Sequence, residues 1–161
     1  MLARIAATTE GRRPPARLRE LRERCTSRAP TTAAEAISSV VEHALETVPC
    51  AAVFVPTRTG TTARMISRFK PSVWIAAVSR SAEVRRGLAF SYGVHPIDVD
   101  EPKDWREFAA GWVREQGLPG PVAILVAGPS GRHPEANYRI EFLRVEGPSP
   151  DPRKAQEGRS N

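Results

Sequence analysis

Residues 51–78 read AAVFVPTRTGTTARMISRFKPSVWIAAV, and this stretch decides the fold. Its two ends, residues 51–55 and 73–78, are short apolar runs rich in β-branched residues, which is typical of buried strands. Residues 61–69 between them have the spacing of a helix and follow a turn that contains glycine. This order of strand, helix and strand predicts parallel strands joined by a right-handed crossover.

The same alternation continues on both sides of this stretch. We expect further strands at residues 94–99 and 122–126, and further helices at residues 31–47, 82–92 and 104–116. Residues 138–145 follow a loop without a crossover helix, which predicts an antiparallel edge strand. The predicted fold class is therefore α/β: a three-layer sandwich with a mostly parallel sheet of about five strands, helices on both faces and an antiparallel edge strand.

The length of the chain allows one domain and little else, since it has 161 residues, of which 40% are apolar. Residues 31–146 carry the α/β pattern. We interpret residues 1–30 as a remnant helix followed by an Arg-rich connector. Residues 147–161 are rich in proline, glycine, serine and charge, so we expect a disordered tail there.

The net charge is +6, yet residues 1–30 carry +5 and residues 31–150 are neutral. The Arg-rich segment lacks interleaved aromatic residues, so a nucleic-acid partner is not expected. The sequence contains neither an apolar run of about 18 residues nor a signal-peptide pattern, so we expect a cytoplasmic protein without a membrane partner. Cys25 and Cys50 form no CxxC pair, and neither a disulfide framework nor a zinc site is predicted.

A ligand site is expected outside the carboxyl ends of the parallel strands. The first turn at this edge, residues 56–62, reads PTRTGTT. Its threonine hydroxyls, the glycine Gly60 and the N–H groups of a helix start would suit a phosphate, with charge added by Arg58 or Arg64. The alternative interpretation is that these are ordinary cap and turn residues.

A second turn, residues 127–137, is longer than a hairpin between two strands requires. Arg132 and His133 in this turn would suit an anion, and the alternative is a solvated loop. A catalytic triad is not predicted, because no serine or cysteine stands in a nucleophile elbow. A metal site is not predicted either, because the acidic run at residues 98–104 is interpreted as a polar loop in which Asp104 caps a helix.

Residues 51–79 resemble the C-terminal domain of pyruvate kinase, whose pattern is a strand, a T-x-S/T-G-x-T-A-R turn, a helix and an I-I-A-V-T strand. Here the turn reads TRTGTTAR and the second strand WIAAVS. Residues 85–96 and 128–145 are similar to later parts of that domain. Residues 1–10 are similar to the helix that ends the catalytic barrel of these kinases, which implies that the chain starts inside a helix of a larger protein.

The resemblance implies a regulatory domain that binds a phosphorylated small-molecule effector and takes part in a homo-oligomer. In the family the effector is a sugar bisphosphate, a sugar monophosphate or a nucleoside monophosphate. The residues that would hold the phosphate are Thr57, Arg58, Thr59, Gly60, Thr61 and Thr62. Those that would close over the ligand are Gly128, Ser130, Gly131 and Arg132. Trp105 is similar to a tryptophan near the second phosphate, but Trp112 replaces an expected arginine, so we expect a monophosphate.

The resemblance also implies what the chain lacks. A complete catalytic barrel takes about 250 residues, more than this chain has. The magnesium and potassium sites of these kinases belong to that barrel, so we expect no cofactor and no phosphoryl transfer in this chain alone, with a barrel subunit as a partner. Two alternatives stay open: a fragment or split subunit of an active pyruvate kinase, which converts phosphoenolpyruvate and ADP to pyruvate and ATP, or a degenerate oligomerisation domain.

Overall fold

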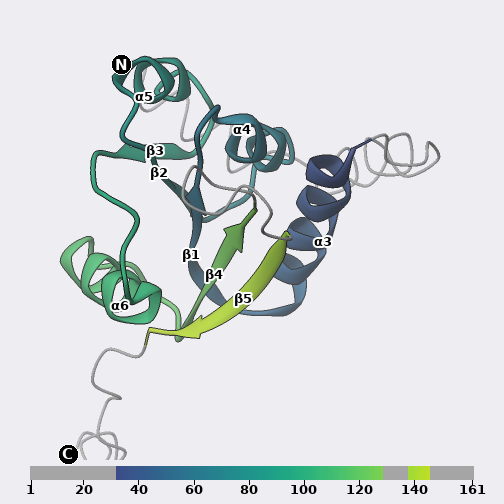
Figure 1. Cartoon of the computed structure of the whole chain (residues 1–161). Coiled ribbons are helices and arrows are strands. Elements are labelled where there is room, and N and C mark those ends of the chain that lie inside the picture. Colours follow the sequence, from purple (N-terminus) through teal and green to yellow (C-terminus); the bar gives the residue numbers. More distant parts are fainter. Residues whose placement is uncertain (1–31, 129–137, 146–161) are drawn as a thin grey trace, which may run out of the picture. The chain divides into compact units, whose positions relative to one another are not determined.

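The computed structural model describes residues 32–128 and 138–145. The helices and strands of this part, labelled as in Figure 1, are α3 (Ala33–Thr47), β1 (Cys50–Pro56), α4 (Thr61–Ser67), β2 (Trp74–Val78), α5 (Ala82–Leu88), β3 (Val94–Ile97), α6 (Trp105–Glu115), β4 (Val122–Ala127) and β5 (Arg139–Arg144). The predictions for residues 1–30 and 147–161 lie outside the described residues.

The five strands form one sheet in the order β3-β2-β1-β4-β5. β1 pairs in parallel with β2 and β4, and β2 pairs in parallel with β3. β5 pairs antiparallel with β4, with Ala127 opposite Arg139 and Val122 opposite Arg144. The prediction of a mostly parallel sheet with an antiparallel edge strand is therefore confirmed.

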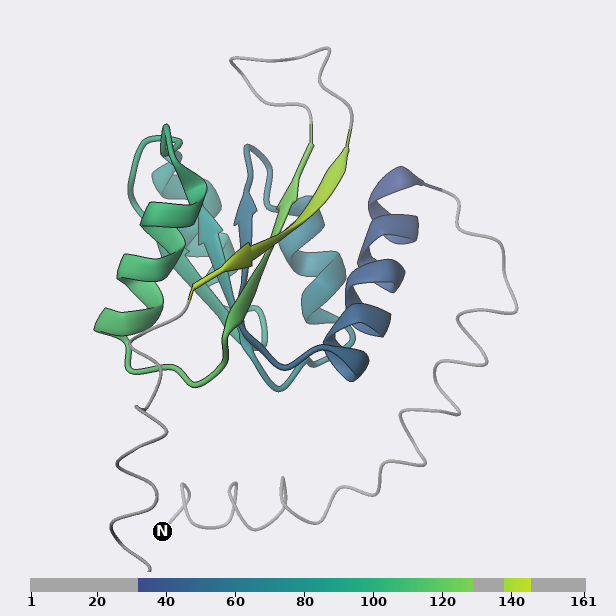
Figure 2. The same ribbon diagram turned by 90° about the horizontal axis from the view of Figure 1, so that it is seen from below.

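Successive residues of the central strand β1 point to the two faces of the sheet. Val53 and Val55 belong to the core cluster that also contains Ile66 of α4, and Phe54 belongs to the cluster that contains Ala109 of α6. Figure 2 shows the sheet between α6 on one side and α3 and α4 on the other. Helices thus cover both faces, which confirms the three-layer sandwich.

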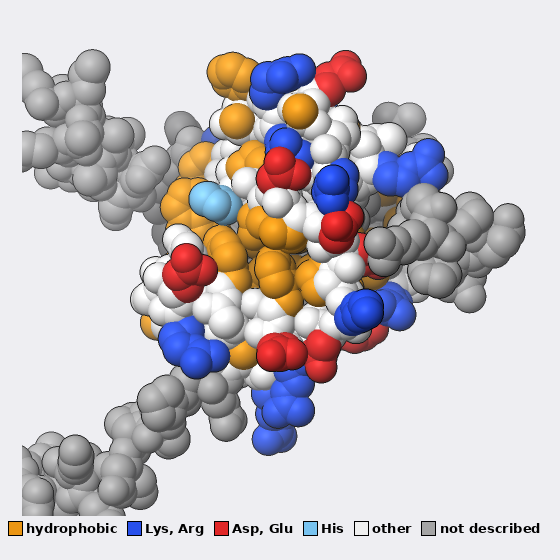
Figure 3. All heavy atoms as spheres, turned by 60° about the vertical axis from the view of Figure 1, so that its left-hand side comes forward, with side chains coloured by type: hydrophobic (Ala, Val, Ile, Leu, Met, Phe, Trp, Pro, Cys, Tyr) orange, Lys and Arg blue, Asp and Glu red, His pale blue; other side chains and the backbone are white. Residues whose placement is uncertain are grey.

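The α6 face of the sheet has an aromatic surface. The ring centroid of His95 lies 6.3 Å from that of Trp74 and 5.7 Å from that of Trp112. Figure 3 shows hydrophobic side chains gathered beside a histidine on one face of the molecule. Trp74 is about half exposed, so part of this aromatic surface is open to solvent.

Several predicted elements are one to four residues longer than the observed ones, and the structure explains two of these differences. The helix predicted to reach residue 92 ends at Leu88, because the following residues have no core to pack against: Phe90 is 94% exposed. The strand predicted to reach residue 99 ends at Ile97, and the Asp98 carboxylate beyond it pairs with Arg85 at 2.7 Å. Among the described residues, no helix is long and apolar enough to cross a membrane.

Candidate functional site

The turn after β1 is closed by its own threonines. The Thr57 N–H donates to the Val78 carbonyl oxygen at 2.9 Å, which continues the β1–β2 pairing. The Thr57 Oγ1 accepts a hydrogen bond from the Gly60 N–H at 2.8 Å. Gly60 has a φ of 79°, a left-handed conformation that glycine adopts without steric cost. We call residues 57–62 the threonine turn.

Two further contacts hold the threonine turn. The Oγ1 atoms of Thr59 and Thr61 lie 2.9 Å apart, so one hydroxyl donates to the other. The hydroxyl that accepts keeps its own hydrogen for another partner. Arg64, in the middle of the seven-residue helix α4, donates from Nη1 to the Thr59 carbonyl oxygen at 2.9 Å. The turn is therefore braced from within and still has hydroxyl groups that can bind a ligand.

A cavity of about 270 Å³ opens beside the threonine turn, at the carboxyl ends of β1 and β4. Its described lining consists of Ala34, Pro56, Thr57, Arg58, Thr59, Thr61, Thr62, Gly128 and Tyr138. Among these residues Arg58 carries the only charge, and there is no carboxylate. A site with hydroxyl donors, one guanidinium group and no acid suits an anion.

The structure brings together six of the residues that the sequence analysis singled out: Thr57, Arg58, Thr59, Thr61, Thr62 and Gly128. Gly60 is buried within the turn and shapes it without lining the cavity. Trp105 does not line the cavity. It begins α6, is 9% exposed and packs edge-on against Phe108. Ser130, Gly131 and Arg132 lie outside the described residues, as does His133.

Sequence reasoning missed Tyr138 as a residue of the cavity. A Cβ atom added to Gly128 would lie 2.6 Å from the Tyr138 Cε1, so the tyrosine ring occupies the space that a side chain would need. The signal for this contact is the strand register: because Ala127 lies opposite Arg139 in an antiparallel pair, Gly128 and Tyr138 come next to each other.

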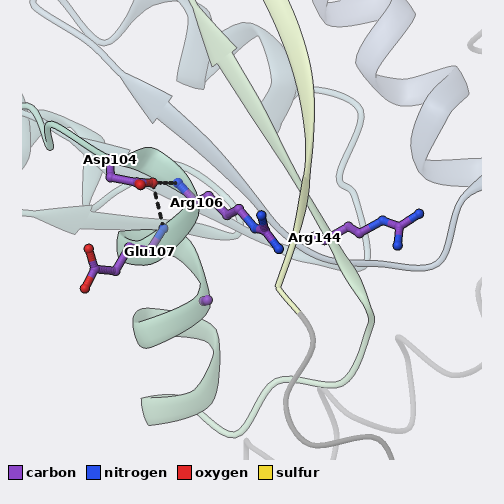
Figure 4. A pocket seen from close by; sticks show the side chains of 5 residues that line it. Asp104, Arg106, Glu107 and Arg144 are labelled. Atoms are coloured by element: carbon purple, nitrogen blue, oxygen red, sulfur yellow. Dashed lines mark hydrogen bonds between the residues drawn. The ribbon is translucent and has the colours of Figure 1, made fainter.

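A second cavity, of about 330 Å³, lies between α6 and β5 (Figure 4). Its carboxylate Asp104 accepts hydrogen bonds from the N–H groups of Arg106 at 2.8 Å and Glu107 at 3.0 Å, so Asp104 caps α6 as predicted. Arg106, Glu107 and Arg144 give this cavity charges of both signs. The Asp104 carboxylate is engaged by the helix, and the other charged side chains have both signs. This cavity therefore favours neither an anion nor a cation.

The acidic loop before α6 is also engaged locally. Asp98 pairs with Arg85, and Asp100 pairs with Arg80 at 2.7 Å. Within residues 32–128 and 138–145, no group of three or more histidine, cysteine, aspartate or glutamate side chains could hold a metal ion. The two ion pairs and the Asp104 cap are the contacts of a polar loop that precedes a helix.

Comparison with known proteins identifies the family. The family model described as "Pyruvate kinase, alpha/beta domain" matches residues 35–138, and the chain belongs to this family. The resemblance found in the sequence is therefore confirmed, and with it the α/β fold of the family's C-terminal domain.

Individual relatives agree with this assignment. The pyruvate kinase of Thermococcus litoralis is 46% identical over 104 residues, which cover 63% of this chain and 22% of that protein. The pyruvate kinase of Lactococcus lactis is 32% identical over 120 residues, or 71% of this chain and 24% of that protein. A solved structure, Cryptosporidium parvum pyruvate kinase in complex with ADP, superposes with a TM-score of 0.62 at 28% identity, covering 74% of this chain and 25% of that one. The matched part of the chain thus spans about a quarter of the length of each of these three proteins.

Proposed function

We propose that this chain is a regulatory domain of the pyruvate kinase C-terminal type, and that it binds a phosphorylated effector at the threonine turn. The observation that carries the proposal is the described lining of the cavity, where four threonines and Arg58 meet and which contains no carboxylate. Hydroxyl and guanidinium groups are the donors that phosphate oxygens accept from in proteins.

The positions of two tryptophans favour an effector with one phosphate. The tryptophan suggested for a second phosphate, Trp105, is buried on the α6 side of the sheet. Trp112, which stands where an arginine was expected, packs on Phe54 with ring centroids 5.5 Å apart. A monophosphate therefore fits better than a bisphosphate.

The catalytic activity of the family is proposed to lie outside this chain, because the chain spans about a quarter of its relatives. We expect no transfer of a phosphoryl group from phosphoenolpyruvate to ADP by this chain alone. If the domain works with a catalytic barrel, effector binding changes activity only to the extent that the effector binds the two states of the assembly with different affinity.

A degenerate oligomerisation domain is the second candidate. Val40 on α3 is 55% exposed, and a second copy packed on α3 would cover it. In that case the chain would self-associate, and phosphorylated metabolites would leave its thermal stability unchanged.

Thermal unfolding of the full chain tests the proposal with inorganic phosphate, ribose 5-phosphate, glucose 6-phosphate, AMP and fructose 1,6-bisphosphate as probes. A ligand present at 100 times its dissociation constant stabilises the fold by about 2.7 kcal/mol, a rise in melting temperature on the order of 10 °C. Thr59→Val should reduce the shift to about half or less, since it keeps the β-branched shape and removes a hydroxyl whose hydrogen bond to a charged ligand is worth about 1.5–3 kcal/mol.

Thr47→Val is the matched control. The Thr47 hydroxyl bonds to carbonyl oxygens of α3, and Thr47 does not line the cavity. This variant should keep the full ligand shift. An unchanged melting temperature with all five probes, or an equal shift in wild type and Thr59→Val, would contradict the proposed site.

A further inference from the structure

The cavity beside the threonine turn has two chemically different ends. The turn, after β1, supplies hydroxyl groups and Arg58, whereas Tyr138, just before β5, supplies an aromatic ring. β4 separates these two strands in the sheet, so two interstrand spacings, about 10 Å, lie between them. Side chains reach into the cavity from both sides, and a ligand that touches both ends needs an anionic group and a second group joined by a short spacer.

The ring of Tyr138 is held in place by a glycine. Cβ added to Gly128 would lie 2.6 Å from Cε1 and 2.7 Å from Cδ1 of the ring, so only glycine leaves room for it there. Tyr138 is nevertheless 42% exposed, which leaves part of the ring free for another contact. The ring is thus supported by backbone on one side and open to the cavity on another.

The chemistry around the ring favours a flat, apolar partner. The described lining residues that are neither threonine nor Arg58 are Ala34, Pro56, Gly128 and Tyr138, and apart from the tyrosine hydroxyl their side chains carry no polar atom. The hydroxyl groups of a sugar find few partners among such side chains. A nucleobase presents a π face, and stacking on aromatic side chains is a general way in which proteins bind bases.

We propose that the ligand of this cavity is a nucleoside monophosphate, with its base stacked on Tyr138 and its phosphate on the threonine turn. The ribose then spans the gap between the two ends. This inference rests on the proposed function, and it selects one of the three effector classes that the family resemblance left open. Tyr138 becomes the residue that separates nucleotides from sugar phosphates.

Titration calorimetry of the full chain tests this with AMP, ribose 5-phosphate and inorganic phosphate as probes. Wild type should bind AMP at least about 5-fold more tightly than ribose 5-phosphate, because stacking of one base contributes a factor of about 5 to 150 in affinity. Tyr138→Ala should weaken AMP by that factor and leave ribose 5-phosphate unchanged. Tyr138→Phe should keep AMP binding, because it keeps the ring.

Two further variants separate stacking from general damage. Gly128→Ala displaces the ring without removing it and should weaken AMP selectively. Phe142→Ala, which removes another exposed aromatic ring from the adjoining strand β5, should change none of the three affinities. Circular dichroism and the melting temperature of each variant report whether the fold is kept.

The outcomes distinguish this inference from the proposed function. If AMP and ribose 5-phosphate bind equally well, or if Tyr138→Ala weakens both by the same factor, the base does not stack on Tyr138, and the phosphate site stands without it. The comparison of the two probes on wild type decides this even if Tyr138→Ala fails to fold. If none of the three probes binds, both the inference and the proposed function are overturned.

Discussion

The guanidinium group of Arg64 bonds to the carbonyl oxygen of Thr59 at 2.9 Å and so joins α4 to the middle of the threonine turn. Two glycines leave room for it. A Cβ atom would lie 3.2 Å from the Arg64 Nη2 if added to Gly87, and 3.3 Å from Cζ if added to Gly60. Arg64 therefore supports the turn from outside the cavity, because it does not belong to the described lining.

Removal of this support should affect ligand binding more than stability. Arg64→Ala loses one hydrogen bond of an exposed side chain, worth about 0.5–1.5 kcal/mol, so the free energy of unfolding should fall by no more than that. The affinity for inorganic phosphate should fall by about 2- to 10-fold because Thr59 is no longer fixed. Calorimetry and urea unfolding measure the two effects.

The control is Arg68→Ala, a second exposed arginine of the same segment, whose guanidinium contacts only the Met65 sulfur among the described contacts, at 3.4 Å. It should leave phosphate affinity unchanged. Equal loss of affinity in both variants would mean that phosphate affinity depends on the general positive charge of this surface and not on the contact between Arg64 and Thr59.

A side chain at Gly60 should destabilise the fold. Gly60→Ala places a non-glycine residue at a φ of 79°, which costs about 1–2 kcal/mol, and its Cβ would lie 3.0 Å from Cδ2 of the buried Leu88. We expect a loss of about 2–3 kcal/mol in the free energy of unfolding. Urea unfolding at constant m-value measures it.

Gly87→Ala is the matched control for this effect. Gly87 lies within α5, has no left-handed φ, and its Cβ would meet only the end of the flexible Arg64 side chain. Because alanine is the better helix former, this variant should gain about 0.5–1 kcal/mol. A stability loss at Gly87 as large as that at Gly60 would show that crowding around Arg64, and not backbone strain, governs both positions.

Gly120 tests a close approach of two backbone segments. Its φ is 127°, and a Cβ there would lie 2.7 Å from the Ala51 nitrogen and 2.9 Å from the Cys50 carbonyl carbon, atoms of β1 that cannot rotate away. Gly117 has a φ of 62° with nothing within 4 Å of its Cβ position, so Gly117→Ala carries backbone strain alone. Gly120→Ala should therefore cost more than the roughly 1–2 kcal/mol expected for Gly117→Ala, as measured by urea unfolding. Equal losses at both sites would mean that β1 moves aside.

The strands and helices of this domain could be predicted because local patterns indicate them. Val53 and Phe54 are both fully buried, on opposite faces of β1, which makes the strand a continuous apolar run. The end of α5 could not be predicted, because the apolar pattern continues through Phe90 although no core lies beside it. The residue at which a helix or strand ends depends on the tertiary packing around it, and a local sequence pattern carries no information about that packing.

The candidate site could likewise be predicted only in part from the sequence. The threonine turn is contiguous in the sequence, and its glycine and hydroxyl groups are enough to indicate a ligand-binding turn. Tyr138 meets Gly128 only through the pairing of β5 with β4, across a connection of nine residues outside the described part. The family resemblance placed Trp105 near the ligand. In the structure Trp105 packs on the α6 side of the sheet, and the sheet separates α6 from α4.

Burial of the Cys50 thiol predicts an alkaline loss of stability. Burial raises the pKa of Cys50 above its ordinary value of 9.0, because the thiolate is poorly solvated at the start of β1. The folded chain therefore holds this proton more tightly than the unfolded chain. The resulting stabilisation is complete below about pH 9 and is lost as the pH rises through the raised pKa.

Cys50→Ala isolates this contribution. Both proteins should carry Cys25→Ser, so that Cys50 is the only thiol of the parent and the variant has none. Urea unfolding between about pH 8 and pH 10 should show a steeper fall in the free energy of unfolding for the parent than for Cys50→Ala, since lysines and tyrosines titrate equally in both. The native thiol should also react with a disulfide reagent more slowly than the thiol of the unfolded chain, because the thiolate is the reactive form. Parallel pH profiles of the two proteins would mean that Cys50 ionises as freely in the fold as in the unfolded chain, and that water reaches the start of β1.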